Sequence, residues 1–202
     1  FLRLGQLYSE EAFQDEEKAY YWYSRAYGCG KKEAGLALAR FCLAEGEHRD
    51  QQKAEQLLTE YASEDNHWED QNEACLLLGQ LYGGEIEGTA GVDWNRAVEY
   101  YERGAAQGNE ACKRRLGRLY FEGEHVQQDY NRAFLFFKEC KENGVLQDVL
   151  PLAFLYQNGY GCEKDERKAA DLYLEAAEKE KNGDAYYELG KLYENGEQIP
   201  QD

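Results

Sequence analysis

Apolar residues recur along this chain at helical spacing and in a repeated order, most completely over 74–108. There, Leu78, Leu81 and Tyr82 occupy positions i, i+3 and i+4, so they share one face of a helix. Gly79 interrupts that face. Because a glycine inside a helix costs about 0.5–1 kcal/mol relative to alanine, we expect Gly79 to allow a close approach between two helix backbones.

A second helix is predicted after a Gly-rich loop in the same segment. It should begin after Asp93, whose carboxylate can accept hydrogen bonds from the unpaired amides of the first turn, and end at Gly108. Between them lie the bulky pair Tyr100 and Tyr101 and then the small Gly104. Large and small residues at fixed offsets are typical of interlocking helices. The segment therefore predicts a pair of packed helices.

Both halves of this unit recur. The Leu-small-x-apolar-Tyr pattern starts at intervals of 34 to 40 residues, at Leu4, Leu38, Leu78, Leu116, Leu152 and Leu189. The Asp-x-x-(Lys/Arg)-Ala pattern starts at Asp15, Asp50, Asp93, Asp129 and Asp165. Such periodicity predicts an all-α solenoid of antiparallel helix pairs, in which each unit buries its apolar face against its neighbours. The predicted units are 1–33, 34–73, 74–110, 111–148, 149–184 and the partial unit 185–202.

The 34–73 unit departs most from the pattern. Its first helix lacks the glycine and the tyrosine, its second lacks the aromatic pair, and Tyr61 stands where other units carry a small residue. The acidic segment 62–73 contains Trp68. Two interpretations of Trp68 stay open: it folds back onto a neighbouring helix, or it is exposed as a contact for a partner.

These motifs resemble the Sel1-like repeat family, a relative of the tetratricopeptide repeats. The family pattern Ala-x-x-x-Leu-Gly-x-Leu-Tyr, followed by a Gly-rich loop and Asp-x-x-Lys-Ala, is met closely by 74–108 and well by 112–144 and 152–183. Units longer than 34 residues favour it over the tetratricopeptide repeats. The resemblance implies a right-handed superhelix whose first helices line a concave side. It also implies a scaffold or adaptor that binds a partner protein or peptide, and not an enzyme.

The candidate binding residues follow from this geometry. The position two residues after each leading leucine should point away from the core, and the helix around Leu116 adds further arginines. The candidate partner-binding residues are Arg40, Gln80, Arg114, Arg115, Arg118, Phe154, Lys191 and Trp68. Two interpretations of the basic residues stay open. They compensate glutamates on adjacent units, or they form a groove that binds the carboxylates of a peptide.

Charge narrows the classes of partner. With 40 acidic and 23 basic residues, the net charge is −17, which opposes binding to nucleic acid and to anionic membranes. No segment approaches the roughly 18 apolar residues that cross a bilayer, so we expect no direct membrane contact. The chain begins without Met and inside a repeat. We expect it to be a piece of a longer protein, whose open solenoid ends favour further repeats or self-association.

The sequence contains few candidates for reactive or metal-binding groups. The six cysteines show no Cys-x-x-Cys spacing, which argues against zinc. We interpret them as small buried apolar residues, which favours a reducing compartment such as the cytoplasm; a periplasmic, secreted or ER-lumenal location stays open. No P-loop motif, nucleophile–histidine spacing or carboxylate pair stands out. We therefore predict no catalytic, cofactor-binding or metal-binding residues. The main hypothesis is an interaction scaffold, the alternative a regulatory or targeting arm of a larger enzyme or signalling protein, and a hydrolase is disfavoured.

Overall fold

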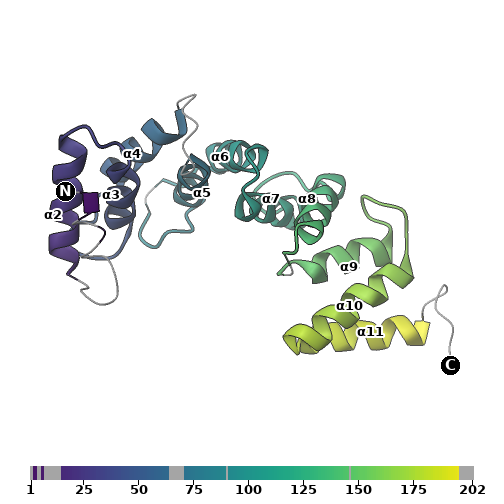
Figure 1. Ribbon diagram of the computed structural model, residues 1–202. Helices are drawn as coiled ribbons and strands as arrows, with labels where there is room; N and C mark the ends of the chain where they lie inside the picture. The colour runs from purple at the N-terminus through teal and green to yellow at the C-terminus, as the bar shows by residue number, and fades with distance from the viewer. Residues whose placement is uncertain are drawn as a thin grey trace. The chain divides into compact units, whose positions relative to one another are not determined.

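The computed structural model describes residues 2, 3, 6, 15–63, 71–89, 91–145 and 147–195. Over these ranges the regular structure is helical, with ten helices joined by turns and short loops (Figure 1). In chain order they are α2 (Glu16–Gly28), α3 (Ala34–Leu43), α4 (Gln51–Ser63), α5 (Gln71–Tyr82), α6 (Trp94–Ala106), α7 (Glu110–Glu122), α8 (Tyr130–Glu142), α9 (Val149–Asn158), α10 (Glu166–Glu180) and α11 (Gly183–Asn195).

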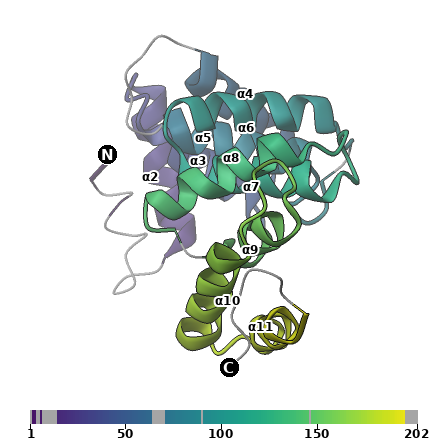
Figure 2. The same cartoon turned by 90° about the vertical axis from the view of Figure 1, so that its right-hand side faces the viewer.

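The helices form two compact units, Phe1–Gln107 and Gly108–Asp202. In the first unit α3 pairs with α4 and α5 with α6, while α2 contacts α3 and α4 contacts α5. In the second, α7 pairs with α8 and α9 with α10; α8 contacts α9, and α10 contacts α11, which Figure 2 shows end-on beside it. Sequential pairing of this kind confirms the predicted all-α repeat fold. The boundaries of the individual repeats stay a prediction.

The aspartates of the second motif act as N-caps, as predicted. Each accepts a hydrogen bond through its carboxylate from the backbone amide three residues further along, at 3.0–3.1 Å. The five donors are the amides of Lys18, Lys53, Arg96, Arg132 and Lys168. These bonds satisfy amides that have no partner inside the helix, and they fix where each second helix begins.

Gly79 has a different role from the one predicted. A Cβ atom built there would lie 2.3 Å from the buried ring of Tyr101, and one at Gly117 would lie 2.6 Å from the ring of Phe137. The close approach is therefore between a helix backbone and an aromatic ring of the paired helix. The expectation of two approaching backbones was wrong, because the ring fills the space that the glycine leaves.

The 34–73 unit packs by exchanging its large and small positions. Tyr61 replaces the small residue of the second helix, and Gly35 provides the space on the first: a Cβ at Gly35 would lie 2.9 Å from the Tyr61 ring. The Tyr61 hydroxyl donates a hydrogen bond to the carbonyl of Lys32. This exchange explains how α3 and α4 pair although their sequences lack the usual signature.

Four of the six free thiols are buried, at Cys42, Cys75, Cys112 and Cys140. Burial, and after it a hydrogen bond to Glu110, raises the pKa of the Cys140 thiol to about 12. Burial also raises the pKa of the Cys42 and Cys75 thiols. Thiolate formation at these positions is therefore suppressed, whereas Cys29 is exposed.

Replacing Gly79 with alanine is expected to lower the free energy of unfolding by about 1–3 kcal/mol, because the added methyl group overpacks against Tyr101. Urea denaturation measures the change. Gly190→Ala is the matched control, since nothing lies within 4 Å of its Cβ position on α11; we expect a gain of up to about 1 kcal/mol there. Equal losses at the two positions would contradict the ring–glycine interpretation.

A thiol reagent is expected to modify Cys29 within the dead time of mixing and to leave the four buried thiols unmodified until the chain unfolds. Thiol titration with and without urea, with mass mapping of the modified peptides, makes the measurement. Fast modification of Cys75 or Cys112 in the folded protein would show that these side chains are open to solvent.

Candidate interaction surface

In the first unit, the charge of Arg40 is already compensated. Arg40 lies on α3, and its Nε donates to Glu73 Oε1 on α5 at 2.7 Å. A second guanidinium nitrogen contacts the other oxygen of the same carboxylate, which makes the pair bidentate. Gln80, also on α5, is half-buried. At Arg40 the structure therefore supports compensation between neighbouring repeats.

In the second unit, two of the predicted arginines converge on one buried carboxylate. Arg114 Nε lies 2.5 Å from Asp148 Oδ2, and Arg118 Nε lies 2.7 Å from Asp148 Oδ1. The Asp148 side chain is only 3% exposed. It stands at the N-cap of α9 yet makes no hydrogen bond to the backbone there. Asp148 instead pairs with two cations of α7, which offset the cost of burying its charge.

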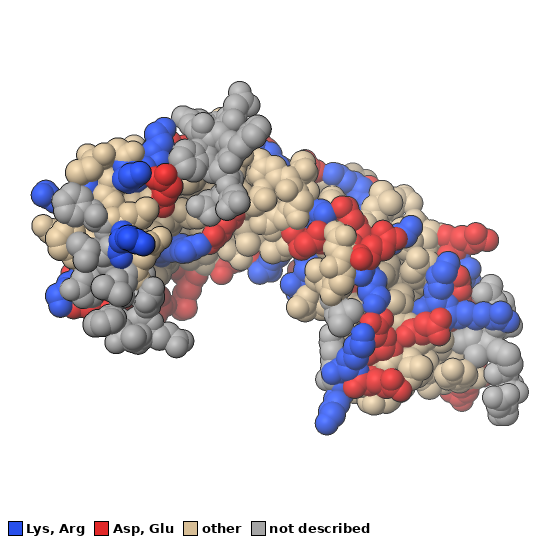
Figure 3. Space-filling model, viewed as in Figure 1, with Lys and Arg blue, Asp and Glu red and all other residues tan. Residues whose placement is uncertain are grey.

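The remaining predicted residues are dispersed. Arg115 is half-buried on α7. Lys191 is exposed on α11, where it pairs with Glu188 at 3.0 Å and lies over the ring of Tyr187. Trp68 lies outside the described residues. The described candidates thus occupy both units, and on the face in Figure 3 acidic and basic side chains of the second unit are interleaved.

Sequence reasoning missed a set of polar contacts that repeat at a spacing of 33 or 34 residues. Besides the pairs of Arg40 and Arg114, the set comprises Tyr20–Lys53 at 2.7 Å, Tyr27–Glu60 at 2.6 Å and Lys141–Glu175 at 2.5 Å. Each joins one repeat to the next. Comparing equivalent positions of successive units, instead of searching for clusters along one helix, would have found these contacts.

Phe154 belongs to an exposed cluster of aromatic rings, here called the aromatic quartet: Phe121, Tyr130, Phe154 and Tyr160. The Phe154 ring lies 5.7 Å from Phe121 and 5.9 Å from Tyr160, measured between centroids. Tyr160 stacks on Tyr130 at 4.9 Å, and Tyr130 meets Phe121 at 5.8 Å. Phe154 is 36% exposed and Tyr160 is 42% exposed, so two of the four rings present apolar area to solvent.

A glycine places Tyr160 over Tyr130. Gly161 has φ +72°, and a Cβ there would lie 2.2 Å from the carbonyl oxygen of Tyr130. Only glycine lets the loop after α9 lie against the start of α8. The sequence singled out Phe154 alone, because the four residues come from three helices and one loop that are separated along the chain.

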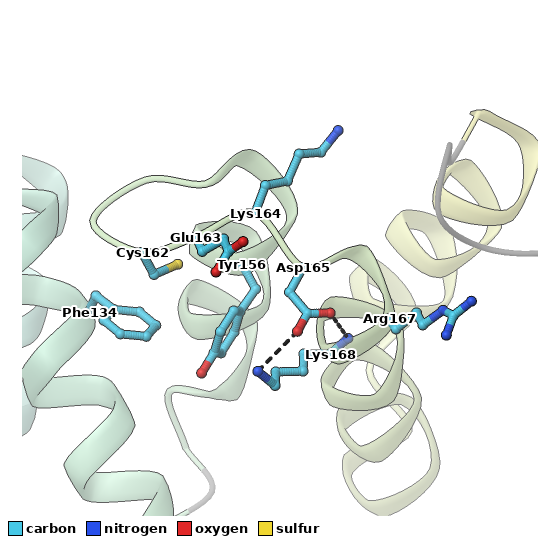
Figure 4. Close-up of a pocket in the computed structure, with 8 residues that line it drawn as sticks. All are labelled: Phe134, Tyr156, Cys162, Glu163, Lys164, Asp165, Arg167 and Lys168. Atoms are coloured by element: carbon cyan, nitrogen blue, oxygen red, sulfur yellow. Dashed lines mark hydrogen bonds and ion pairs between the residues drawn. The ribbon is translucent and has the colours of Figure 1, made fainter.

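An open pocket of about 870 Å³ lies between α8 and α10 (Figure 4). Phe134 of α8 and Tyr156 of α9 meet edge to face within it, 5.1 Å apart. Cys162 and the charged residues 163–165, 167 and 168 complete the lining. Burial raises the pKa of the Tyr156 hydroxyl, whereas the charge of Lys168 acts to lower it. The sequence analysis did not predict this pocket.

In the described part of the chain, no group of three or more His, Cys, Asp or Glu residues could hold a metal ion. None of the described helices combines the length and the apolar character needed to cross a membrane.

Helices paired in chain order, with aspartate caps and rings packed over glycines, define an α-helical repeat protein. The Sel1 repeat model matches residues 2–31, 72–109, 111–145, 152–180 and 183–202, which is more than half of the chain. The chain therefore belongs to the Sel1 repeat family, as the motifs predicted. Residues 32–71, which include most of the 34–73 unit, are not among the matched residues.

The chain is also similar in sequence to known proteins. The chain is 29% identical over 127 residues to chitin synthase regulatory factor 3 of Schizosaccharomyces pombe, covering 60% of this chain and 13% of that protein. It is 23% identical over 130 residues to the Sel1-repeat-containing protein YjcO of Escherichia coli, covering 62% of this chain and 56% of that protein. The chain thus spans about half or less of these relatives.

Two solved structures resemble the whole chain. A protective antigen of uropathogenic Escherichia coli with an SLR fold superposes with a TM-score of 0.80 at 26% identity, and the match covers 42% of that chain. A Sel1 repeat protein of Oxalobacter formigenes gives a TM-score of 0.69 at 26% identity, with 78% of that chain covered. Both similarities support the helical repeat fold.

Replacing Asp148 with alanine is expected to lower the free energy of unfolding by about 1–3 kcal/mol. The change removes hydrogen bonds between charged groups and leaves two arginines beside an apolar position, although solvent partly screens their charge. Chemical denaturation measures the loss. Asp171→Ala, at an exposed position of α10, is expected to stay within about 0.5 kcal/mol of the unmodified protein. Equal stability of the two variants would refute the role of Asp148.

Proposed function

We propose that this chain is a protein–protein interaction scaffold that binds a partner protein or peptide through the aromatic quartet. The observation that carries the proposal is the exposure of Phe154 and Tyr160 although their rings are held by neighbouring rings. Rigid, partly exposed aromatic side chains provide large contact area at low entropic cost and are enriched among residues that dominate binding energy. No catalytic role is part of the proposal.

The polar residues predicted from the sequence contribute less to the proposed binding than the aromatic quartet does. Arg114 and Arg118 hold α7 and α9 together through Asp148, so they shape the surface more than they attract a ligand. Arg40, Gln80, Arg115, Lys191 and Trp68 remain proposed partner contacts. Replacing Arg118 with glutamate would not test the proposal, because it would place a second negative charge beside Asp148 and disturb the surface itself.

The second candidate function is a regulatory or targeting arm of a larger protein. It is favoured by two fungal relatives with regulatory names, chitin synthase regulatory factor 3 and chitin synthase regulator SKT5, of which the chain spans 13% and 15%. An arm of this kind also acts by binding, so the two candidates share the same surface. They differ in what the flanking parts of the full protein do.

A peptide-display selection against the purified chain tests the scaffold proposal. Peptides enriched on the unmodified chain are expected to lose affinity at least tenfold for Phe154→Ser, because the exposed ring is the proposed anchor. Leu135→Ser is the matched control, since Leu135 is an exposed apolar residue of α8 that is not part of the aromatic quartet; the affinity of this variant for the peptides is expected to stay unchanged.

Thermal melting of both variants checks that their fold is intact. If the selection enriches no peptide, or if the peptides bind Phe154→Ser as tightly as the unmodified chain, the aromatic quartet is not the binding surface and the proposal is wrong.

A further inference from the structure

Equivalent tyrosines in three repeats share one contact. Tyr82, Tyr120 and Tyr156 each end the leucine-led motif of a first helix, and each ring lies beneath the basic residue of the following aspartate-led motif. The basic residues are Arg96, Arg132 and Lys168, at 4.2 to 5.3 Å from the ring centroids. This cation–π contact ties the two helices of a repeat together. The repeats differ in what the tyrosine hydroxyl binds.

At Tyr82 the hydroxyl binds a carboxylate supplied by the preceding repeat. It donates to Glu55 Oε1 of α4 at 2.5 Å and accepts from Arg96 at 3.2 Å. Arg96 lies 3.9 Å from the same glutamate and 3.6 Å from Asp93, the cap of its own helix. Burial, and then the hydrogen bond to Glu55, raises the pKa of Tyr82 to about 12. The Tyr82 hydroxyl, the Glu55 carboxylate and the Arg96 guanidinium group therefore form one set in which each group contacts the other two.

At Tyr156 the carboxylate of this set is missing. The residue that follows the motif's alanine in the preceding repeat is Glu55 for Tyr82, but it is Phe134 for Tyr156. The Phe134 ring packs edge-on against Tyr156 and offers no acceptor. Within the described ranges the Tyr156 hydroxyl has no hydrogen-bond partner. Lys168 pairs with Asp165 at 3.0 Å, as Arg96 does with Asp93, but it lacks a counterpart of Glu55.

The space left at Tyr156 is large enough for a ligand group. The 870 Å³ pocket lies within the range of small-ligand sites. Figure 4 shows the Tyr156 hydroxyl and the Lys168 ammonium group close together, while Lys164 and Arg167 point away. A second hollow of about 220 Å³ shares Tyr156 and Lys168 with the pocket.

The second hollow has only a small excess of positive charge, because each of its lysines is already paired with a carboxylate. It is bordered by Lys138, Lys141 and Lys168 against Glu142 and Asp171, although the chain as a whole carries a net charge of −17. Glu142 faces the same hollow and pairs with Lys138 at 3.8 Å. Asp171 lines the same hollow, and Glu163 and Asp165 line the larger pocket, so the test must distinguish these internal carboxylates from an external one.

We propose that the pocket at Tyr156 binds a glutamate side chain presented by a partner protein, whose carboxylate accepts from the Tyr156 hydroxyl as Glu55 does from Tyr82. The Tyr156 hydroxyl donates a hydrogen bond to the carboxylate, and the Lys168 ammonium group supplies the opposite charge. This assignment rests on the proposed scaffold function, because the partner supplies the carboxylate. It adds a pocket for one acidic residue of the partner to a surface that otherwise binds through aromatic rings.

The test uses N-acetylglutamate α-amide as the probe, titrated into the isotope-labelled chain and followed by the NMR shifts of backbone amides. We expect saturable shifts at Tyr156, Cys162 and Lys168, and none with N-acetylglutamine α-amide. Tyr156→Phe removes one oxygen atom and is expected to weaken binding about tenfold or more, as for loss of a hydrogen bond to a charged group. Tyr82→Phe is the matched control and is expected to leave probe binding unchanged.

Two further variants test the comparison between repeats. Phe134→Glu supplies the carboxylate from within the chain and is expected to abolish probe binding, with thermal melting to confirm the fold. Glu55→Ala empties the place at Tyr82 and is expected to create a second probe site there. Neither result is expected if Tyr156 has only a packing role.

The proposal is overturned if no shift saturates, if the glutamine probe acts equally, or if Tyr156→Phe binds as tightly as the unmodified chain. Probe binding that occurs only in Glu142→Gln would show that Glu142 fills the site internally, and it would also overturn the proposal. Tighter binding of N-acetylglycine would reassign the site to a C-terminal carboxylate. The probe experiment requires no partner protein. A negative result there therefore does not decide the outcome of the peptide-display selection.

Discussion

The fold depends on one packing constraint within each helix pair: a large side chain of one helix must enter the space left by a small residue of the other. Tyr101 over Gly79 and Phe137 over Gly117 satisfy this constraint in the same register. Tyr61 over Gly35 satisfies it one helical turn away, with the large and small positions exchanged. Since each unit buries its apolar face only against its neighbours, this interlocking decides whether a repeat pairs at all.

The sequence predicted the repeat fold because its strongest signals are local. An aspartate cap and the apolar face that follows it lie within a few residues of each other, so single helices and their order could be inferred directly. The role of Gly79 could not, because the sequence does not show which group fills the space beside it. For the same reason, the sequence did not predict the exchange at Gly35 and Tyr61. The repeat pattern of the 34–73 unit is therefore weak in sequence, although its two helices pack together.

The candidate surface was less predictable than the fold. Charge alone suggested a basic groove, but the structure pairs Arg40 with Glu73, and both Arg114 and Arg118 with Asp148. Aromatic rings separated by about 30 residues in the chain meet only because Gly161 brings its loop onto α8. The open hydroxyl of Tyr156 becomes visible only when equivalent positions of different repeats are compared. Local motifs describe what the repeats share, whereas these features arise where the repeats differ.

The buried carboxylate of Asp148 also limits how the chain can be rearranged. The first helix of the preceding pair, α7, carries arginines at both positions that reach it, whereas α5 carries Leu76 and Gln80 at the corresponding places. A recombinant chain in which 147–184 followed α5 and α6 would therefore bury a negative charge with no cation beside it. The units look alike in sequence but are not interchangeable modules, and their order along the chain is fixed by electrostatics as well as by shape.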